Sequence, residues 1–472
     1  MAKNPTAGFK PAAESKSQLP SITLSPRGVG RIKSGHPWVY RSDISVAPEV
    51  PPGATVKVLD PRGKFLGTAL YSSSSQIAVR MIAREDVRDL SALVSQRIRE
   101  AMAYRKRVVA DTNAYRVVFS EADFLPGLIV DRYNDVVSVQ ILTQAMDAEA
   151  IRGVIIETLV EEFQPAGIVE RVDPRIRELE QLPARQSGLL WGKKSSTVIT
   201  MNGAIPDPTA AKAAVEGTAS IAALKRSTPV GENQAARGPR RCDTQDQVPP
   251  SGSDGLTGDN GASGIRFHYD GLEGQKTGAF LDQRENYAAA ARYGRGNALD
   301  VFCYQGGFAL HLAPVCSNVT GVDSSRPALE MAEKNAALNS QLLNGKEIEW
   351  IEANAFDLLR DYAAAGRRYD TIVLDPPAFA KTKRDLAKAL SGYKELNLRA
   401  LKMLKPGGIL VTCSCSFHVS RHEFVEVVSA AACDVHRYLR VLENRAQAKD
   451  HPMLLNVPET AYLKCLVLSA SN

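Results

Sequence analysis

The stretch that decides the fold is residues 370–416, which begins with DTIVLDPPAF and ends with GILVTCSCS. Both ends are apolar runs that finish in polar or turn-forming residues, and the segment between them reads as a helix. Two nearly continuous apolar runs joined by a helix are typical of strands in a parallel sheet that is buried on both faces. The stretch therefore predicts an α/β fold, with Asp375 and Cys415 near the carboxyl ends of two strands.

The same alternation continues upstream and extends the α/β pattern over residues 263–472. Three further apolar runs read as strands: NALDVFCY (297–304), NVTGVDSS (318–325) and EIEWIEAN (347–354). Helices are expected near residues 308–313, 327–339, 356–364 and 385–404. Strands that alternate with helices predict a Rossmann-like, mostly parallel, doubly wound sheet with helices on both faces.

The N-terminal half has a different pattern. Residues 1–20 are rich in Pro, Ser and Lys and predict a disordered tail. Short β-like runs between Pro-Gly turns predict a small all-β barrel over residues 21–89, and a helix leads from it into a central α+β domain over residues 90–203. Residues 204–262 contain no aromatic residue and are dominated by small and polar residues, so we expect a disordered insertion there.

Charge and composition limit the class of protein. The chain has 472 residues and a net charge of +6, but residues 1–110 hold 18 Lys and Arg against 8 Asp and Glu, a local net charge of +10. Such a basic end favours an acidic polymer as partner, and an ordinary solvated surface is the alternative. No apolar run is long enough for a membrane helix and the N-terminus has no signal-peptide core, so we expect a cytoplasmic protein without a membrane partner.

A glycine turn and two acids predict a cofactor site. The strand at 297–304 passes through Gly306-Gly307 into a helix, and glycine lets the backbone approach a ligand. Asp323 ends the next strand, 23 residues after Asp300, a spacing that suits an acid that binds ribose hydroxyls. The turn lacks the G-x-G-x-x-G of dinucleotide sites, so S-adenosylmethionine fits better than NAD or FAD. The alternative is a tight turn in a core that binds nothing.

Asp375 and Cys415 carry the chemistry that we expect. The prolines after Asp375 can continue neither a ladder nor a helix, so backbone carbonyls stay open to a planar base. C5 of cytosine or uracil becomes nucleophilic only after something adds at C6, and a thiolate suits that addition. Cys413 is the rival of Cys415, and a chain that turns at Ser414 would separate them. The seven cysteines lack zinc-like or disulfide-like spacings, so we expect reduced thiols and no metal.

Short motifs spread along the chain form a recognisable set. They are GRIKSGHPWVYRSDI (30–44), FLPGLIVDRY (124–133), GQKTGAFLDQR (274–284), ALDVFCYQGGF (298–308), GVDSS (321–325), DPPAF (375–379), GYKELN (392–397), TCSCS (412–416) and DHP (450–452). As a set they resemble the bacterial RlmI-like family of 23S ribosomal RNA cytosine-5 methyltransferases, over nearly everything outside the tail and the insertion. The resemblance implies an N-terminal PUA-type RNA-binding barrel and a C-terminal class I S-adenosylmethionine-dependent methyltransferase domain.

The resemblance implies Cys415 as the nucleophile and S-adenosylmethionine binding through Gln283, Arg284, Asp323, Asn354 and Asp375. The chemistry of the residues adds Asp375 as a catalytic group beside the base and completes the two sets that follow. The expected cofactor residues are Lys276, Thr277, Gln283, Arg284, Asp300, Phe302, Tyr304, Gly306, Gly307, Asp323, Asn354, Ala355 and Asp375. The expected substrate-binding residues are Pro376, Pro377, Phe379, Arg31 and Lys33. Arg284 is expected to pair with the methionine carboxylate, and Lys276 or Thr277 to cover the site. Three positions depart from the family pattern, namely Gln305, Asn354 and Ala378.

We therefore expect an enzyme that forms 5-methylcytosine on an unstacked base of ribosomal RNA. The expected partner is 23S ribosomal RNA, free or in a large-subunit assembly intermediate, and a homodimer stays open. One rival enzyme methylates an exocyclic amine such as guanine N2, with Cys415 merely structural. A rival of another class is a non-catalytic RNA-binding assembly factor, which the basic N-terminal region favours. No pattern in the chain identifies the base that removes the C5 proton.

Overall fold

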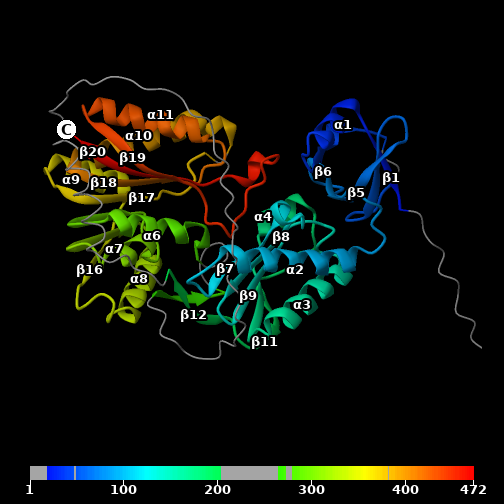
Figure 1. Ribbon diagram of the computed structural model, residues 1–472, viewed down its shortest axis with the longest axis horizontal. Helices are drawn as coiled ribbons and strands as arrows, with labels where there is room; N and C mark the ends of the chain where they lie inside the picture. The colour runs from blue at the N-terminus through cyan, green and yellow to red at the C-terminus, as the bar shows by residue number, and fades with distance from the viewer. Residues whose placement is uncertain (1–18, 47–48, 203–263, 273–278, 381, 472) are drawn as a thin grey trace, which may run out of the picture.

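The computed structural model describes residues 19–46, 49–202, 264–272, 279–380 and 382–471. Within them the chain forms an N-terminal, a central and a C-terminal part, each built on a sheet of its own (Figure 1). Most of the predicted tail, the predicted insertion, and the expected cofactor residues Lys276 and Thr277 lie outside the described residues. Among the described helices, none is long and apolar enough to cross a membrane.

The N-terminal part is a six-stranded sheet with the order β2-β6-β5-β4-β1-β3. Its strands are β1 (Ser21–Leu24), β2 (Trp38–Tyr40), β3 (Ile44–Val46), β4 (Thr55–Leu59), β5 (Phe65–Tyr71) and β6 (Ile77–Ala83), with the short helix η1 (Arg41–Asp43) before β3. Inward positions such as Ile22, Val56 and Val79 are fully buried. The predicted strands of the barrel are thus present in the structure.

The all-β description of this part is incomplete, because helix α1 (Pro26–Lys33) lies between β1 and β2. Gly28 and Gly30 disfavour a helix, and for that reason the sequence pattern does not predict one. A start signal outweighs them: the Ser25 hydroxyl accepts a hydrogen bond from the N–H of Gly28 (3.2 Å), and a proline follows. Gly28 also lies close to Asp43, where a Cβ atom would be 2.9 Å from the carbonyl oxygen.

The central part is a five-stranded sheet with the order β11-β10-β9-β8-β7, and helices α2 and α3 pack on it. Its elements are α2 (Leu90–Val108), β7 (Ala114–Phe119), η2 (Ser120–Asp123), β8 (Leu128–Tyr133), β9 (Val136–Ile141), α3 (Glu149–Phe163), β10 (Gly167–Glu170), α4 (Pro174–Leu179) and β11 (Gly188–Gly192). These elements agree with the predicted α+β pattern.

A two-stranded ribbon connects the central and C-terminal parts. In it, β12 (Ser196–Met201) pairs antiparallel with β13 (Ile265–Asp270), so the segments on either side of the predicted insertion are hydrogen-bonded neighbours. The ring of Tyr269 stacks on the ring of Tyr133, with centroids 3.7 Å apart, and both belong to a core cluster that continues into the C-terminal part. The ribbon therefore gives the two parts a shared hydrophobic core.

The C-terminal part is a seven-stranded sheet with the order β16-β15-β14-β17-β18-β20-β19. Its strands are β14 (Asn297–Val301), β15 (Asn318–Asp323), β16 (Ile348–Glu352), β17 (Tyr369–Leu374), β18 (Leu404–Ser414), β19 (Tyr438–Arg445) and β20 (Lys464–Ser471). The strands from β14 to β18 run parallel, whereas β20 runs antiparallel to β18 and to β19. The predicted doubly wound sheet is confirmed, and β20, the one strand of this sheet that runs in the opposite direction, lies next to the edge strand β19.

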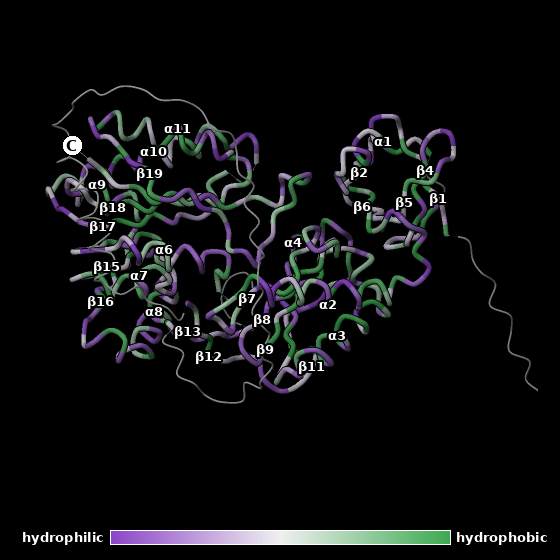
Figure 2. The backbone as a smooth tube through the Cα atoms, viewed as in Figure 1, coloured by the Kyte–Doolittle hydropathy of each residue, from purple (hydrophilic) through white to green (hydrophobic). Residues whose placement is uncertain are grey.

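Helices cover both faces of this sheet. Those on one face are α6 (Arg284–Tyr293), α7 (Gly307–Leu312) and α8 (Arg326–Leu338), and those on the other are α9 (Ala355–Ala364), α10 (Leu386–Met403) and α11 (Arg421–Asp434), as Figure 1 shows. The short helices η4 (Leu281–Gln283), η5 (Lys383–Asp385) and η6 (Pro458–Thr460) complete the part. Figure 2 shows hydrophobic residues concentrated along the strands, which fits strands buried between two helical layers.

The loop between β19 and β20, residues 446–463, contacts the other two parts. The guanidinium of Arg105 on α2 donates a hydrogen bond to the carbonyl of Asp450 (2.8 Å). His36 Nε2, between α1 and β2, lies 3.3 Å from the carboxylate of Glu459. This loop, called the bridging loop below, therefore links the C-terminal sheet to both the central part and the barrel.

Candidate active site

The carboxyl ends of β14 and β17 form the point where the strand order reverses, and ligands of open α/β sheets bind at such points. Leu374 of β17 pairs with Val301 of β14 on one side and with Thr412 of β18 on the other. Asp375 follows Leu374 and therefore lies between the glycine turn after β14 and the cysteines after Thr412. The fold brings the predicted cofactor turn, acid and thiol to one edge of the sheet.

The turn after β14 has an unusual backbone conformation. Phe302, Tyr304 and Gly306 have φ angles of 67°, 49° and 85°, in the left-handed region that favours glycine. The N–H of Phe302 donates to the carbonyl of Val322 (2.8 Å), and the N–H of Tyr304 donates to the carboxylate of Asp323 (2.9 Å). Non-glycine residues in this region cost about 1–3 kcal/mol each, and such strain clusters at ligand sites. The conformation thus supports this turn as a binding element.

The two glycines of the turn are required by packing within the protein. A Cβ atom on Gly306 would lie 2.8 Å from the ring of Trp350, and one on Gly307 would lie 2.5 Å from the ring of Tyr287. From the sequence, both glycines are expected to allow the approach of a ligand, whereas their neighbours in the structure are aromatic side chains. The turn therefore needs glycine whether or not a ligand is bound.

Asp300 and Asp323 have different environments. Asp300 is fully buried; its Oδ2 accepts a hydrogen bond from the N–H of Ala309 (2.8 Å), and its Oδ1 has no partner within the described ranges. Burial raises the pKa of Asp300 well above its ordinary value. The two oxygens of Asp323 accept hydrogen bonds from the N–H groups of Tyr304 and Ser325 (both 2.9 Å). Asp300 offers a buried acceptor, and Asp323 shapes the turn.

Asn354, which was expected to contact the adenine, caps helix α9. Its Oδ1 accepts hydrogen bonds from the N–H groups of Phe356 (2.9 Å) and Asp357 (3.4 Å), and its side chain is exposed at the end of β16. Ala355 next to it is buried. The contact of Asn354 and Ala355 with the cofactor stays a prediction.

Gln283 and Arg284, at the start of α6, have different partners. Gln283 Nε2 donates to Asp375 Oδ1 (2.8 Å), so an expected cofactor residue orients the expected catalytic acid. Arg284 is 2% exposed, and its guanidinium lies 3.0 Å from the carboxylate of Asp450. Because Asp450 already balances its charge, the contacts of Arg284 favour a structural role over the expected pairing with the methionine carboxylate.

Asp450 has a role that its motif, DHP, did not indicate from the sequence. Its carboxylate accepts a hydrogen bond from the N–H of Arg116 on β7 (2.8 Å) in addition to the pair with Arg284. Burial acts to raise the pKa of Asp450, but His451 and Arg284 outweigh it and hold the pKa well below its ordinary value. This buried carboxylate fixes the bridging loop to the central part and to the start of α6.

The two cysteines of TCSCS differ in accessibility because β18 ends at Ser414. Cys413 is fully buried and pairs in register with Cys465 of β20, and burial raises its pKa well above the ordinary value for a thiol. Cys415 is half-buried, and its Sγ lies 3.8 Å from the carbonyl of Pro376. The thiol of Cys415 therefore lies against the Asp-Pro-Pro turn, as its expected role requires.

Side chains from other elements hold the turn after β18. The Ser416 hydroxyl shares a hydrogen bond with the hydroxyl of Tyr393 on α10 (2.9 Å), and Phe379 packs on Tyr393 with ring centroids 4.8 Å apart. Phe379, which was expected to bind the substrate base, thus belongs to an aromatic cluster with Tyr393. Pro376 is buried, and Pro377 is exposed.

Arg31 and Lys33, also expected to bind the substrate, lie elsewhere. Both belong to α1, which Figure 1 shows on the barrel, well away from β17 and β18. Arg31 lies 3.5 Å from the carboxylate of Asp43 and over the ring of Tyr40 (4.7 Å), and Lys33 is exposed. Their position suits contacts with RNA outside the reacting nucleotide.

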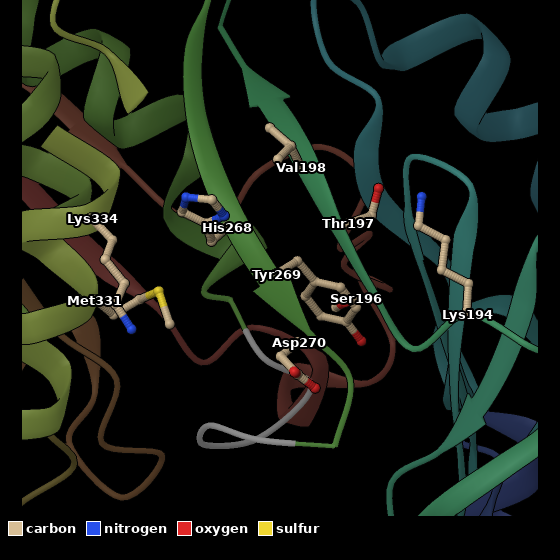
Figure 3. A pocket seen from close by; sticks show the side chains of 9 residues that line it. All are labelled: Lys194, Ser196, Thr197, Val198, His268, Tyr269, Asp270, Met331 and Lys334. Atoms are coloured by element: carbon tan, nitrogen blue, oxygen red, sulfur yellow. The ribbon is translucent and has the colours of Figure 1, made fainter. Parts of the chain in front are cut away.

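An open hollow of about 500 Å³ lies beside the ribbon (Figure 3), and neither Asp375 nor Cys415 lines it. Its lining comes from β12, β13, α8 and the segment before β12. The lining residues are Lys194, Ser196, Thr197, Val198, His268, Tyr269, Asp270, Met331 and Lys334. None of them was expected to bind cofactor or substrate, so the hollow is separate from the site at the strand ends.

Comparisons with known proteins agree with this architecture. Residues 22–84 match the family model of a PUA-like domain, and residues 240–468 match that of an S-adenosylmethionine-dependent methyltransferase. Proteins named Ribosomal RNA large subunit methyltransferase I from Tolumonas auensis and Pseudoalteromonas translucida are 34% and 33% identical over 92% of this chain and 95% and 96% of their own length. The crystal structure of SMU.776 with SAH matches with a TM-score of 0.70 at 16% identity, over 96% of this chain and 100% of that chain, which shows the fold.

Proposed function

The chain belongs to the ribosomal RNA large subunit methyltransferase I family, and we propose that it forms 5-methylcytosine in 23S ribosomal RNA by covalent catalysis at Cys415. Membership of this family makes the chain an S-adenosylmethionine-dependent ribosomal RNA methyltransferase. One observation carries the finer proposal. The Cys415 Sγ lies 3.8 Å from the carbonyl of Pro376, the residue after Asp375, whereas Cys413 is buried.

The residues at the strand ends suit S-adenosylmethionine. Two carboxylates, Asp323 at the end of β15 and Asp375 just after β17, lie at the same edge of the sheet, and such a pair repels phosphates but attracts a sulfonium and an ammonium group. The buried Oδ1 of Asp300, without a partner in the described part of the chain, is an acceptor for a cationic or N–H donor. When bound there, S-adenosylmethionine supplies an electrophilic methyl group and leaves as S-adenosylhomocysteine.

The side chains of the site account for the activation of the base. The thiolate of Cys415 adds to C6 of cytosine, and the new S–C6 bond makes C5 nucleophilic toward the methyl group. Asp375, oriented by Gln283, contacts N3 and the exocyclic amine and holds the ring. Loss of the C5 proton to a base, and finally to water, restores the C5=C6 double bond and breaks the S–C6 bond. The enzyme is then free for another cycle.

The N-terminal barrel is proposed to hold the RNA around the target. It belongs to the basic first 110 residues, and its exposed Lys33 and half-buried Arg31 suit contacts with phosphates. In this proposal residues 21–89 bind RNA and residues 263–472 methylate a base that has left its stack. Residues 90–203 connect these two parts.

The substrate is proposed to be cytoplasmic 23S ribosomal RNA, either free or in a large-subunit assembly intermediate. Methylation assays with both forms distinguish them, because contacts of the barrel with folded RNA depend on shape. A homodimer stays an open alternative to a monomer, and analytical ultracentrifugation of the protein with and without RNA distinguishes the two.

The test of the proposed function maps methyl groups in ribosomal RNA after reaction with wild-type protein, Cys415→Ala and Cys413→Ala. We expect 5-methylcytosine with the wild type and with Cys413→Ala, and none with Cys415→Ala, which should still bind S-adenosylmethionine. Full activity of Cys415→Ala with product at guanine N2 would favour an exocyclic-amine methyltransferase instead. Absence of methyl transfer by wild-type protein to any RNA would favour a non-catalytic assembly factor.

A further inference from the structure

A buried lysine lies beside the turn that carries Cys415. Lys464 is the first residue of β20 and stands opposite Ser414 in the antiparallel pairing of β20 with β18. Its Nζ donates hydrogen bonds to the carbonyls of Ser416 (2.6 Å) and Val419 (2.8 Å), and the residue is 4% exposed. The ammonium is therefore fixed against the backbone that directly follows the thiol.

The charge of this ammonium is poorly balanced. Both hydrogen bonds that Lys464 makes within the described residues go to carbonyl oxygens, which carry no net charge. The negative charge of Glu423 on α11 acts to raise the pKa of Lys464. The Glu423 carboxylate, however, already accepts a hydrogen bond from the N–H of Ser420 (2.7 Å). Burial lowers the pKa of Lys464 to about 8, and Cys415 is the strongest of the groups that oppose this shift.

Other titratable and charged groups face the thiol from the surrounding elements. Arg421 of α11 adds a second positive charge near Lys464. Burial raises the pKa of Tyr393 on α10, and a charge on Cys415 adds to this shift. On the side of β17, Asp375 precedes the proline whose carbonyl the thiol contacts, and a carboxylate there disfavours a thiolate. Lys464 is the cation that opposes Asp375 at the thiol, whereas Arg421 acts on Lys464 and on Cys465.

We propose that Lys464 is a positioning residue for the methylation reaction, whose ammonium stabilises the thiolate of Cys415 and fixes the turn that presents it. The inference rests on the proposed role of Cys415 as the nucleophile. A thiol next to a cation loses its proton, here to solvent, at a lower pH than a free thiol, whose pKa is about 8.5. Lys464 therefore increases the share of Cys415 that is ready to attack at neutral pH.

The test measures the rate at which iodoacetamide alkylates Cys415 in the full-length protein as a function of pH, read at that residue by peptide mass spectrometry. We expect Lys464→Met to slow the alkylation about tenfold at pH 7, since roughly one pKa unit of thiolate stabilisation is removed. The difference should shrink above a pH of about 8, where Lys464 itself loses its proton. If Lys464 were purely structural, the pH profile of Cys415 alkylation in Lys464→Met would match the wild-type profile.

Lys405→Met is the matched control. Lys405 lies near the opposite end of β18 and pairs with Asp370 (2.8 Å), so its loss removes the same charge without affecting the thiol. An alkylation profile of a folded Lys464→Met protein that matches the wild-type profile overturns the inference. If that variant does not fold, the wild-type protein decides, because a Cys415 thiol that titrates at or above the ordinary value of about 8.5 also overturns it.

The alkylation profile tests the role of Lys464 and the methylation assay tests the proposed function, so either claim can fail without the other. Methyl transfer to cytosine by Cys415→Ala would contradict the proposed function, while the alkylation profile of wild-type Cys415 would still report the effect of Lys464. Conversely, an unchanged profile in Lys464→Met together with inactive Cys415→Ala would remove the role of Lys464 and leave the nucleophile in place.

Discussion

The two turns on either side of Asp375 are held in different ways. The turn after β14 is held chiefly through its backbone: Phe302 and Tyr304 adopt left-handed conformations, and their N–H groups donate to Val322 and Asp323 of the neighbouring strand β15. The turn after β18 is held by side chains from other elements, namely Tyr393 of α10 and Lys464 of β20. Both turns depend on tertiary contacts, but the first is fixed through its main-chain conformation and the second through side-chain hydrogen bonds.

The largest effect should come from the thiol end. Cys415→Ala is expected to lower kcat for methyl transfer at least ~1000-fold, because it removes the thiol that is proposed to add to C6. Binding of S-adenosylmethionine, measured by calorimetry, should stay within about threefold of the wild-type value. A large loss of cofactor affinity in this variant would show that the two turns are not independent.

The next largest effect should come from the bridging loop, which supports the start of α6 and so the Gln283–Asp375 hydrogen bond. Asp450→Asn is expected to lower the free energy of unfolding by about 3–5 kcal/mol at pH 7, because it leaves the buried charge of Arg284 with only the more distant carboxylate of Glu285, at 3.9 Å. Urea unfolding followed by circular dichroism measures this loss.

Asp450→Asn also tests how the stability of the protein depends on pH. The pKa of Asp450 in the folded state is below its value of about 3.9 in an unfolded chain, so its contribution to stability is fully present above that value. The contribution is lost as the pH falls below about 3.9 toward the folded value. The stability difference between wild type and Asp450→Asn should therefore stay constant from neutral pH down to about pH 5 and narrow as the pH falls below about 4, and a difference that stays constant down to about pH 2 would contradict the assignment.

A smaller effect is expected at the cofactor end. Asp323→Asn keeps the size of the side chain but removes the charge that accepts hydrogen bonds from Tyr304 and Ser325. We expect S-adenosylmethionine to bind about 10–100-fold more weakly, with kcat at saturating cofactor changed less than threefold. A fall in kcat without a change in cofactor affinity would assign Asp323 to the thiol end of the site.

The smallest effect should come from Cys413→Ala. The substitution removes one buried sulfur next to Cys465, so we expect a loss of about 1–2 kcal/mol in the free energy of unfolding. Methyl transfer should remain within about threefold of wild type. Loss of activity with retained stability would reverse the roles of the two cysteines.

The same difference between the turns explains how far the sequence was informative. The acid, the glycine turn and Cys415 were predicted correctly to share an edge, because the carboxyl ends of neighbouring parallel strands must meet. Lys464 and Asp450 could not be placed, since both reach the site through pairing and a loop that join segments far apart in the chain. A lysine inside the apolar run KCLVLSA was the one signal available for Lys464.

Local rules also failed where packing outweighed them. Helix α1 was missed because its glycines disfavour a helix, although Ser25 caps it. The pairing of Arg284 with the methionine carboxylate stays a prediction, and its burial against Asp450, which depends on the bridging loop, was not foreseen. The meeting of the strand ends was therefore predictable, and the tertiary partners of the residues there were not.

The most direct test of covalent attack uses a 23S ribosomal RNA transcript in which 5-fluorocytidine replaces cytidine. Fluorine at C5 takes the place of the proton that must leave, so the S–C6 bond should persist after methyl transfer. With S-adenosylmethionine present, we predict an RNA–protein adduct that survives denaturation, maps to Cys415 and is absent from Cys415→Ala. Methylation of ordinary RNA by a protein that forms no such adduct would contradict the account.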